Sequence, residues 1–184
     1  MDAVSKESCT IIYVRLDKQY FKDNSHFIEM LDPNDPVEQN KRMYLFLSVI
    51  YENNTLLVPL RTENEGERSF GIIGYSVPSS TRPNAGLDYR KILVVNDSKY
   101  VMPLENDGVS SSQQRIIREN YSTICNQVIA YVKGYVTAAI KKRERREPKY
   151  CFSTLHNFHK ELGVIEGRKK RNEKKEKVLD KIEV

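Results

Sequence analysis

The chain has no tryptophan, only three cysteines and three histidines, and no long apolar run. Cys9, Cys125 and Cys151 are an odd number, widely spaced, and match no metal-binding motif. No stretch approaches the roughly 18 apolar residues of a membrane helix, and the polar N-terminal residues lack the apolar core of a signal peptide. We therefore expect a cytoplasmic protein that has no cofactor and does not contact a membrane.

The histidines give little support for a metal site either. His156 and His159 are spaced to share one face of a helix, but no third ligand accompanies them. Such a pair is more often a solvated or capped feature of a helix than a zinc site. The sequence therefore predicts no metal ligands.

The charge is unevenly distributed along the chain. The 184 residues fit one domain and carry a net charge of +5. Residues 167–184 hold eight Lys and Arg against four Asp and Glu, so they supply +4 and residues 1–166 only +1. We expect a folded domain over residues 1–166 and a charged C-terminal tail over 167–184. For the tail alone, a solvated helix whose charges serve solubility is the more ordinary interpretation.

The apolar pattern predicts strands first and helices later. Strands are expected at 10–16, 44–51, 55–60, 69–77 and 91–95, with 52–54 as a hairpin turn. A short helical piece follows the first strand, over about 18–31, and a long polar loop spans 78–86. Apolar residues at helical spacing over 116–135, after a serine cap, predict the main helix, and Ser153 and Gly163 bound a final short one. This order predicts an α+β fold with an antiparallel sheet.

The end of the 55–60 strand holds the best candidates for chemistry. RNA can be cleaved without a metal if one group deprotonates the 2′-hydroxyl and others stabilise the charge that develops on phosphorus. Arg61 and Thr62 end the strand, where side chains are well fixed and accessible, and Arg68 follows across a short loop. A polar hairpin rim without a chemical role is the alternative.

Four segments, in order over residues 10–163, resemble the ribonuclease toxins of type III toxin–antitoxin systems, the ToxN, AbiQ, TenpN and CptN group. They are DPVEQN at 35–40, followed by Arg42; PLRT at 59–62; GLDYRK at 86–91; and CFSTLHNFHKEL at 151–162. The GLDYRK segment is similar to the TenpN and CptN branch in particular.

The resemblance implies a compact, highly twisted antiparallel sheet with flanking helices, similar to the MazF and Kid toxins. It implies an endoribonuclease that leaves a 2′,3′-cyclic phosphate and a 5′-hydroxyl, and a role in growth arrest or abortive infection by phage. The inhibitor would be a small RNA pseudoknot derived from tandem repeats. Toxin and RNA would alternate in a closed ring.

The resemblance also assigns roles to residues. Thr62 matches the active-site serine of the family, with Arg61 beside it; Tyr20 matches an early active-site tyrosine, and Arg42 a basic residue before the central strand. Two positions depart from ToxN: Glu38 replaces a tyrosine, and Asn64 replaces a lysine. Charge stabilisation is then expected from Arg61 or Arg68, and Glu38 is a candidate general base.

We expect further residues to bind RNA. Arg90 and Lys91 follow the long loop, and Lys141, Lys142 and Arg145 close the main helix; all are suited to phosphates. Tyr89 is expected to be free to stack on a splayed base. Two alternatives stay open: an RNA-binding protein without catalysis, and a ribonuclease toxin neutralised by a protein antitoxin.

Overall fold

The computed structural model describes residues 12–32, 35–42, 44–64, 71–104 and 108–179, and they form an α+β fold with an antiparallel sheet. The strands are β1 (Ile12–Leu16), β2 (Tyr44–Tyr51), β3 (Asn54–Arg61), β4 (Gly74–Ser76), β5 (Gly86–Asp88), β6 (Leu93–Val94) and β7 (Val101–Pro103). The α-helices are α1 (Lys18–Asp23), α2 (Pro36–Lys41), α3 (Ser111–Glu119), α4 (Tyr121–Ile140) and α5 (Val164–Leu179). Three 3-10 helices, η2 (Tyr89–Lys91), η3 (Ser98–Tyr100) and η4 (Thr154–Phe158), complete the described elements. In this part of the chain no helix is long and apolar enough to cross a membrane.

Strand β3 is the centre of the sheet. The strand order is β4-β5-β3-β2-β1-β7, and β6 also pairs with β3. The predicted hairpin is confirmed: Glu52 and Asn53, both with positive φ, form the turn between β2 and β3, as in the tight turns that match strand twist. Beyond the hairpin, the first half of β3 pairs with β6 and its last residues with β5. The end of β3 is therefore held between two neighbouring strands.

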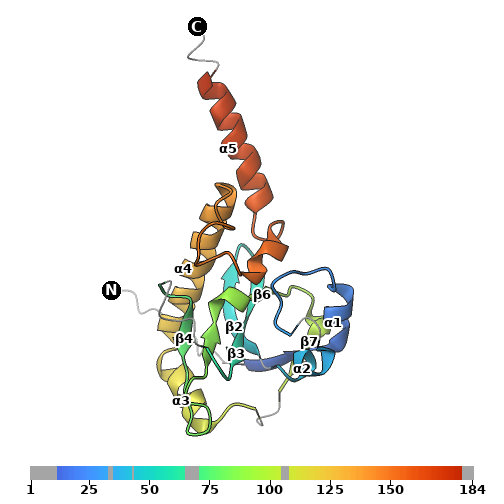
Figure 1. Ribbon diagram of the computed structural model, residues 1–184, viewed down its shortest axis with the longest axis vertical. Coiled ribbons are helices and arrows are strands. Elements are labelled where there is room, and N and C mark those ends of the chain that lie inside the picture. The colour runs from blue at the N-terminus through green and yellow to red at the C-terminus, as the bar shows by residue number, and fades with distance from the viewer. Residues whose placement is uncertain (1–11, 33–34, 43, 65–70, 105–107, 180–184) are drawn as a thin grey trace, which may run out of the picture.

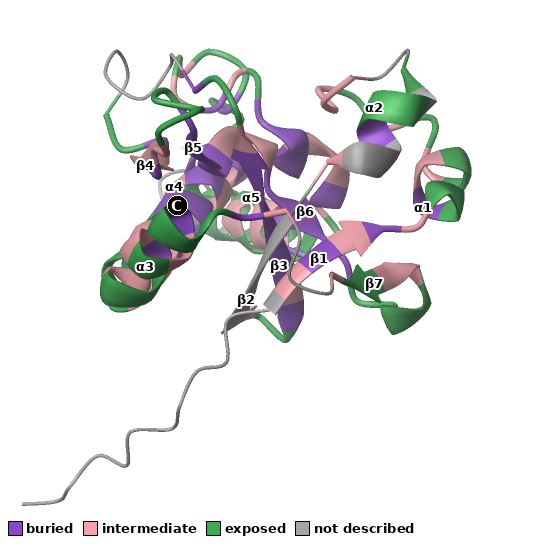
Figure 2. Cartoon of the chain, turned by 90° about the horizontal axis from the view of Figure 1, so that it is seen from below, coloured by how far each residue is buried: buried purple, intermediate pink, exposed green. Residues whose placement is uncertain are grey.

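The helices cover the sheet from two sides. Helix α4 lies along one side, and the short helices α1 and α2 lie on the other (Figure 1). Figure 2 shows that α4 turns a buried stripe toward the sheet while much of α1 to α3 is exposed. That stripe consists of Ile124, Val128, Tyr131, Val132, Tyr135, Ala138 and Ala139, at the 3–4 residue spacing of one helix face. Burial of this face fixes α4 against the core.

The predicted helices differ from the observed ones in detail. The main helix is two helices, because it is interrupted at Asn120, whose side chain donates to the carbonyl of Ile116. Its cap is Ser110, which forms a capping box with Gln113. The final short helix is the 3-10 helix η4, with Ser153 as its cap and Gly163 at a positive φ of 66° before α5.

The predicted division of the chain at residue 167 falls inside α5. The helix begins at Val164, and Arg168 donates to the carbonyl of Ala139 and to Glu144. The start of the charged segment is therefore part of the folded domain, while the rest of α5 projects from it (Figure 1).

Candidate active site

A cavity of about 290 Å³ opens beside the end of β3. Four parts of the chain meet there: α2, the last residues of β3, the loop before β5, and the start of α3. The described lining residues are Glu38, Arg42, Leu60, Arg61, Thr62, Arg82, Ala85 and Gln113. Three predicted site residues, Arg42, Arg61 and Thr62, are thus brought together with a third arginine.

Arg61 is fixed by the strand pairing at the end of β3. It pairs with Gly86 of β5, and its Nη1 donates to the Oδ2 of Asp88 at 2.9 Å. Gly86 is required at this point, because a Cβ there would lie 2.8 Å from the carbonyl oxygen of Tyr75 and 3.0 Å from the Nδ2 of Asn64. The close pairing of β5 with β3 at Gly86 therefore places the carboxylate of Asp88 within hydrogen-bond distance of Arg61.

Asp88 is a fully buried carboxylate that accepts four hydrogen bonds. Besides that of Arg61, they come from the backbone nitrogen, Nε and Nη2 of Arg90, each at 3.0 Å. A buried carboxylate is tolerated when charged donors satisfy it in this way. Arg61 is consequently held on one side while its side chain keeps 30% exposure.

Glu38 lies on α2 and Arg42 directly follows it; the sequence analysis did not predict this helix. Asp35 caps α2 by accepting from the backbone nitrogens of Val37 and Glu38, and Pro36 stands in the first turn. Arg42, just after the helix, forms an ion pair with Asp32. This pair ties the loop before α2 to the edge of the cavity.

Arg82 and Gln113 complete the lining from the long loop and α3. The loop turns tightly, since Ser79 and Arg82 exchange backbone hydrogen bonds of 3.0 and 3.1 Å. Gln113 is buried and donates to the carbonyl of Val77 at 2.8 Å, which anchors the start of the loop to α3. The described part of the chain offers no hydrogen-bond or ion-pair partner to the exposed side chain of Arg82.

Sequence reasoning missed Arg82, Gln113 and the positioning role of Asp88. The available signal was the pair of charged residues, Arg82 and Asp88, on either side of the segment PNAGL. Gln113 had none, because its place in the cavity depends on the packing of α3 against the loop.

The cavity has the chemistry of a site for phosphoryl groups. Three guanidinium groups and one carboxylate line it, and Thr62 adds an exposed hydroxyl. A guanidinium group can donate two parallel hydrogen bonds to the oxygens of one phosphate, and it keeps its charge at all physiological pH values. The residues of the cavity are therefore suited to bind a phosphodiester and to stabilise added negative charge on it.

One predicted catalytic residue, Tyr20, does not join this site. Tyr20 is only 4% exposed, and its ring packs edge-on against Tyr100 and Phe27, with centroids 5.4 and 6.4 Å away. Its role is therefore that of a core residue of the α1 side. Arg68 lies outside the described residues.

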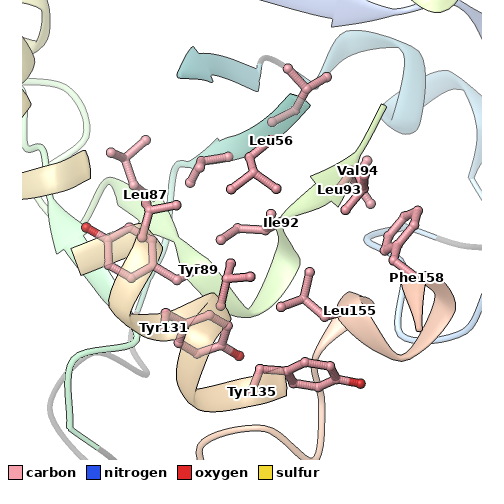
Figure 3. Close-up of a cluster of buried hydrophobic side chains, with 14 of the residues drawn as sticks. Leu56, Leu87, Tyr89, Ile92, Leu93, Val94, Tyr131, Tyr135, Leu155 and Phe158 are labelled. Atoms are coloured by element: carbon pink, nitrogen blue, oxygen red, sulfur yellow. The ribbon is translucent and has the colours of Figure 1, made fainter. Parts of the chain in front are cut away.

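The prediction that Tyr89 is free to stack on a base is wrong. Its ring is fully buried among Leu87, Tyr131 and their neighbours, as Figure 3 shows. Its hydroxyl donates to the Oε1 of Gln127 at 3.0 Å. Tyr89 begins η2 directly after β5, and there its side chain points into the core.

Arg90 and Lys91 are held within the protein rather than presented to RNA. Burial lowers the pKa of Arg90, but the hydrogen bonds and charge of Asp88 outweigh it and leave that pKa raised. The Nζ of Lys91 donates to the carbonyls of Glu29 and Phe152, and burial lowers its pKa. Both cations stabilise the fold, which corrects their assignment as phosphate contacts.

Lys141, Lys142 and Arg145 are exposed, but they do not flank the cavity. They follow the C-terminal end of α4, whereas the cavity lies near the start of α3 (Figure 1). Helix α4 has 20 residues, which separates its two ends by about 30 Å at 1.5 Å per residue. The predicted arrangement around one site is therefore wrong.

A second group of titratable side chains lies near the end of α4. The hydroxyl of Tyr135 is 2.7 Å from the Nδ1 of His156 and 2.8 Å from the Nε2 of His159. Burial, together with the charge of Arg168, lowers the pKa of His159 to about 4, and burial lowers that of His156. Over the described residues no group of three or more side chains is placed to hold a metal ion.

Comparison with known proteins gave no match: no protein-family model fits the chain, and no curated protein sequence and no solved structure matches it. The expected similarity to the MazF and Kid fold stays a prediction.

Proposed function

We propose that the chain is an endoribonuclease whose active site is the cavity at the end of β3. The observation that carries the proposal is the convergence of Arg42, Arg61 and Arg82 on one small cavity beside the hydroxyl of Thr62. A pentacoordinate phosphorus carries more negative charge than the phosphodiester from which it forms. Fixed donors around it stabilise the transition state more than the ground state.

The reaction that fits these residues is transfer of the phosphoryl group to the neighbouring 2′-oxygen. Glu38, the carboxylate of the described lining, takes the proton of the 2′-hydroxyl. The 2′-oxygen forms its bond to phosphorus while the bond from phosphorus to the 5′-oxygen breaks, and that oxygen takes a proton from a water molecule. The proton held on Glu38 then neutralises the hydroxide that this leaves, which restores the carboxylate. The products are a 2′,3′-cyclic phosphate and a 5′-hydroxyl.

Each arginine has a separate part in this scheme. Arg61, held by Asp88, faces the phosphate from the strand. Arg42, held by Asp32, faces it from α2, and Arg82 supplies a side chain with freedom to close over the bound RNA. Arg42 and Arg61 thus orient the phosphate, while the side chain of Arg82, without a partner among the described residues, leaves the RNA access to the cavity.

We further propose that this nuclease is a toxin of the type III kind, inhibited by a repeat-derived RNA. The four sequence segments support this, and three of them contribute to the site or its support: DPVEQN with the following Arg42, PLRT with Arg61 and Thr62, and GLDYRK with Asp88. The same cavity can instead bind a phosphate without cleaving RNA. That second candidate is favoured by the lack of a lysine or histidine in the described lining.

The test is cleavage by purified protein from which bound RNA has been removed. We expect single-stranded RNA to be cut in the presence of EDTA, with cyclic phosphate ends, and a substrate with 2′-deoxyribose throughout to stay intact. Strict dependence on added magnesium contradicts the mechanism. Binding of RNA without any cleavage favours the second candidate.

A further inference from the structure

The positive charge of the molecule is concentrated at the end opposite to the cavity. Residues 141–179 contain 14 Lys and Arg against six Asp and Glu, a net +8, whereas residues 1–140 carry 15 against 17, a net −2. This segment comprises the end of α4, η4 and α5, which lie together at one end of the molecule, with α3 at the other (Figure 1). The start of α3 lines the cavity. The chain is therefore strongly polarised.

Most of these cations are available to a partner. Eight exposed side chains have no hydrogen-bond or ion-pair partner among the described residues. They are Lys141, Lys142, Arg145, Arg146, Lys169, Lys170, Lys174 and Lys175. We call them the basic end.

The basic end is held as one unit by two other arginines. Arg168 donates from Nε to the carbonyl of Ala139 at 2.9 Å and from Nη2 to Glu144 at 2.8 Å, and Arg171 donates to the carbonyl of Ile140 at 3.3 Å. Gly167 makes this contact possible, because a Cβ there would lie 2.5 Å from the Cδ1 of Ile140. The first turns of α5 are therefore docked on the end of α4, and the lysines beyond them project on a fixed helix.

We propose that the basic end is a second RNA-docking surface that binds the phosphate backbone at a distance from the cavity. The proposal rests on RNA being the ligand of the cavity. A row of closely spaced phosphates is the partner that many unpaired cations on a projecting helix fit. A membrane fits poorly, since α5 is without an apolar residue from Glu166 to Glu176 and so has no face to insert.

The separation of the two surfaces sets the size of the RNA. The length of α4, about 30 Å, far exceeds the Debye length of about 8 Å at physiological salt. The basic end therefore does not steer a phosphate within the cavity, and must bind another part of the same RNA. At about 3.4 Å per stacked nucleotide, an RNA of at least about nine nucleotides is needed to reach both.

The test compares three full-length proteins in binding a fluorescent 30-nucleotide single-stranded RNA. The RNA is 2′-O-methylated, so it cannot be cleaved by its own 2′-oxygen. One variant replaces Lys169, Lys170, Lys174 and Lys175 by Gln, which leaves the anchoring arginines in place. The matched control replaces Lys18, Lys22, Lys99 and Lys133 by Gln, exposed lysines outside the basic end, with the same change in net charge.

Each phosphate contact that is lost flattens the dependence of log K on log salt by about 0.7 for single strands. We expect the slope to become less steep by up to about three units in the basic-end variant and to stay unchanged in the control. Circular dichroism checks that both variants are folded. Equal slopes in all three proteins overturn the docking surface while the cavity proposal stands. A 30-base-pair DNA duplex that binds as tightly as the RNA, with the same slope, overturns RNA as the partner.

The two proposals fail separately, because cleavage of unmodified RNA by the wild type is measured in parallel. Absent cleavage together with a flattened slope in the basic-end variant removes the proposed nuclease and supports the docking surface.

Discussion

Replacement of Asp88 by Asn tests how the fold holds its candidate catalytic arginine. Asp88 is fully buried and receives Arg61 and Arg90 as charged donors. The amide keeps the shape but removes the charge, and it turns a donor toward the guanidinium groups. Loss of one partner of a buried ion pair costs about 3–5 kcal/mol. The low end applies here, because the Arg61 side chain is 30% exposed and regains water.

We therefore expect Asp88→Asn to lower the free energy of unfolding by about 3 kcal/mol. For a chain of this length that lowers the melting temperature by roughly 6–12 °C. RNA cleavage below the melting temperature should fall as well, since Arg61 loses its anchor. Calorimetry measures the first effect, and single-turnover cleavage measures the second.

Asp97 provides the matched control. It accepts from the backbone nitrogen of Lys99 at 3.0 Å, caps η3 and pairs with the Lys99 side chain, just as Asp88 caps η2 and pairs with Arg90. Asparagine also caps helices well, and the Asp97 pair is exposed, so Asp97→Asn should melt close to the wild type. If Asp88→Asn melts there too, the buried carboxylate does not organise the site.

Two further predictions concern the cavity and the histidine pair. Arg61→Ala and Thr62→Ala should each slow single-turnover cleavage by about 100- to 1,000-fold while RNA binding measured by fluorescence anisotropy largely survives; two fully active variants remove these residues from the site. Because the pKa of His159 is lowered to about 4 in the folded protein, the unfolded chain binds a proton that the folded one does not between about pH 6.5 and 4, so stability should fall as pH falls through that window. The limit is about 1.4 kcal/mol per pH unit, and partial exposure of His159 reduces it to roughly 1 kcal/mol between pH 7 and 5. Burial also lowers the pKa of His156, so His159→Asn should still lose some stability over this range in urea unfolding, but roughly 1 kcal/mol less than the wild type; equal losses in both proteins contradict it.

The sequence predicted the elements whose structure depends mainly on residues close together in the chain. The hairpin of β2 and β3 followed from its apolar strands around Glu52 and Asn53, and the buried stripe of α4 from its helical spacing. The break at Asn120 was not foreseen, since the apolar spacing continues across it and only the side-chain bond to Ile116 marks it. Helix α2 was missed, although Asp35 and Pro36 stand at favourable positions for the start of a helix.

Reasoning from the residues alone predicted the candidate site only where it lies on one strand, and Arg42 and Glu38 were named through the family resemblance. Arg61 and Thr62 stand at the end of β3 as expected, but residues from other elements depend on long-range packing. Tyr89 was placed at the surface because an aromatic beside two cations suggests RNA binding, whereas the strand order buries it. The block at Lys141 was assigned to the site because the predicted helix that it closes does not reveal which of its ends lies near the cavity.

Arg82→Ala tests most directly whether the cavity cleaves RNA. Arg82 lines the cavity and is exposed, and the described part of the chain holds no partner for its side chain, so its removal should leave the fold unchanged. Arg115→Ala, on an exposed position of α3 outside the lining, is the control. Single-turnover cleavage in EDTA should be about 100- to 1,000-fold slower in Arg82→Ala and unchanged in the control; equal rates in both variants and the wild type contradict the assignment of the active site.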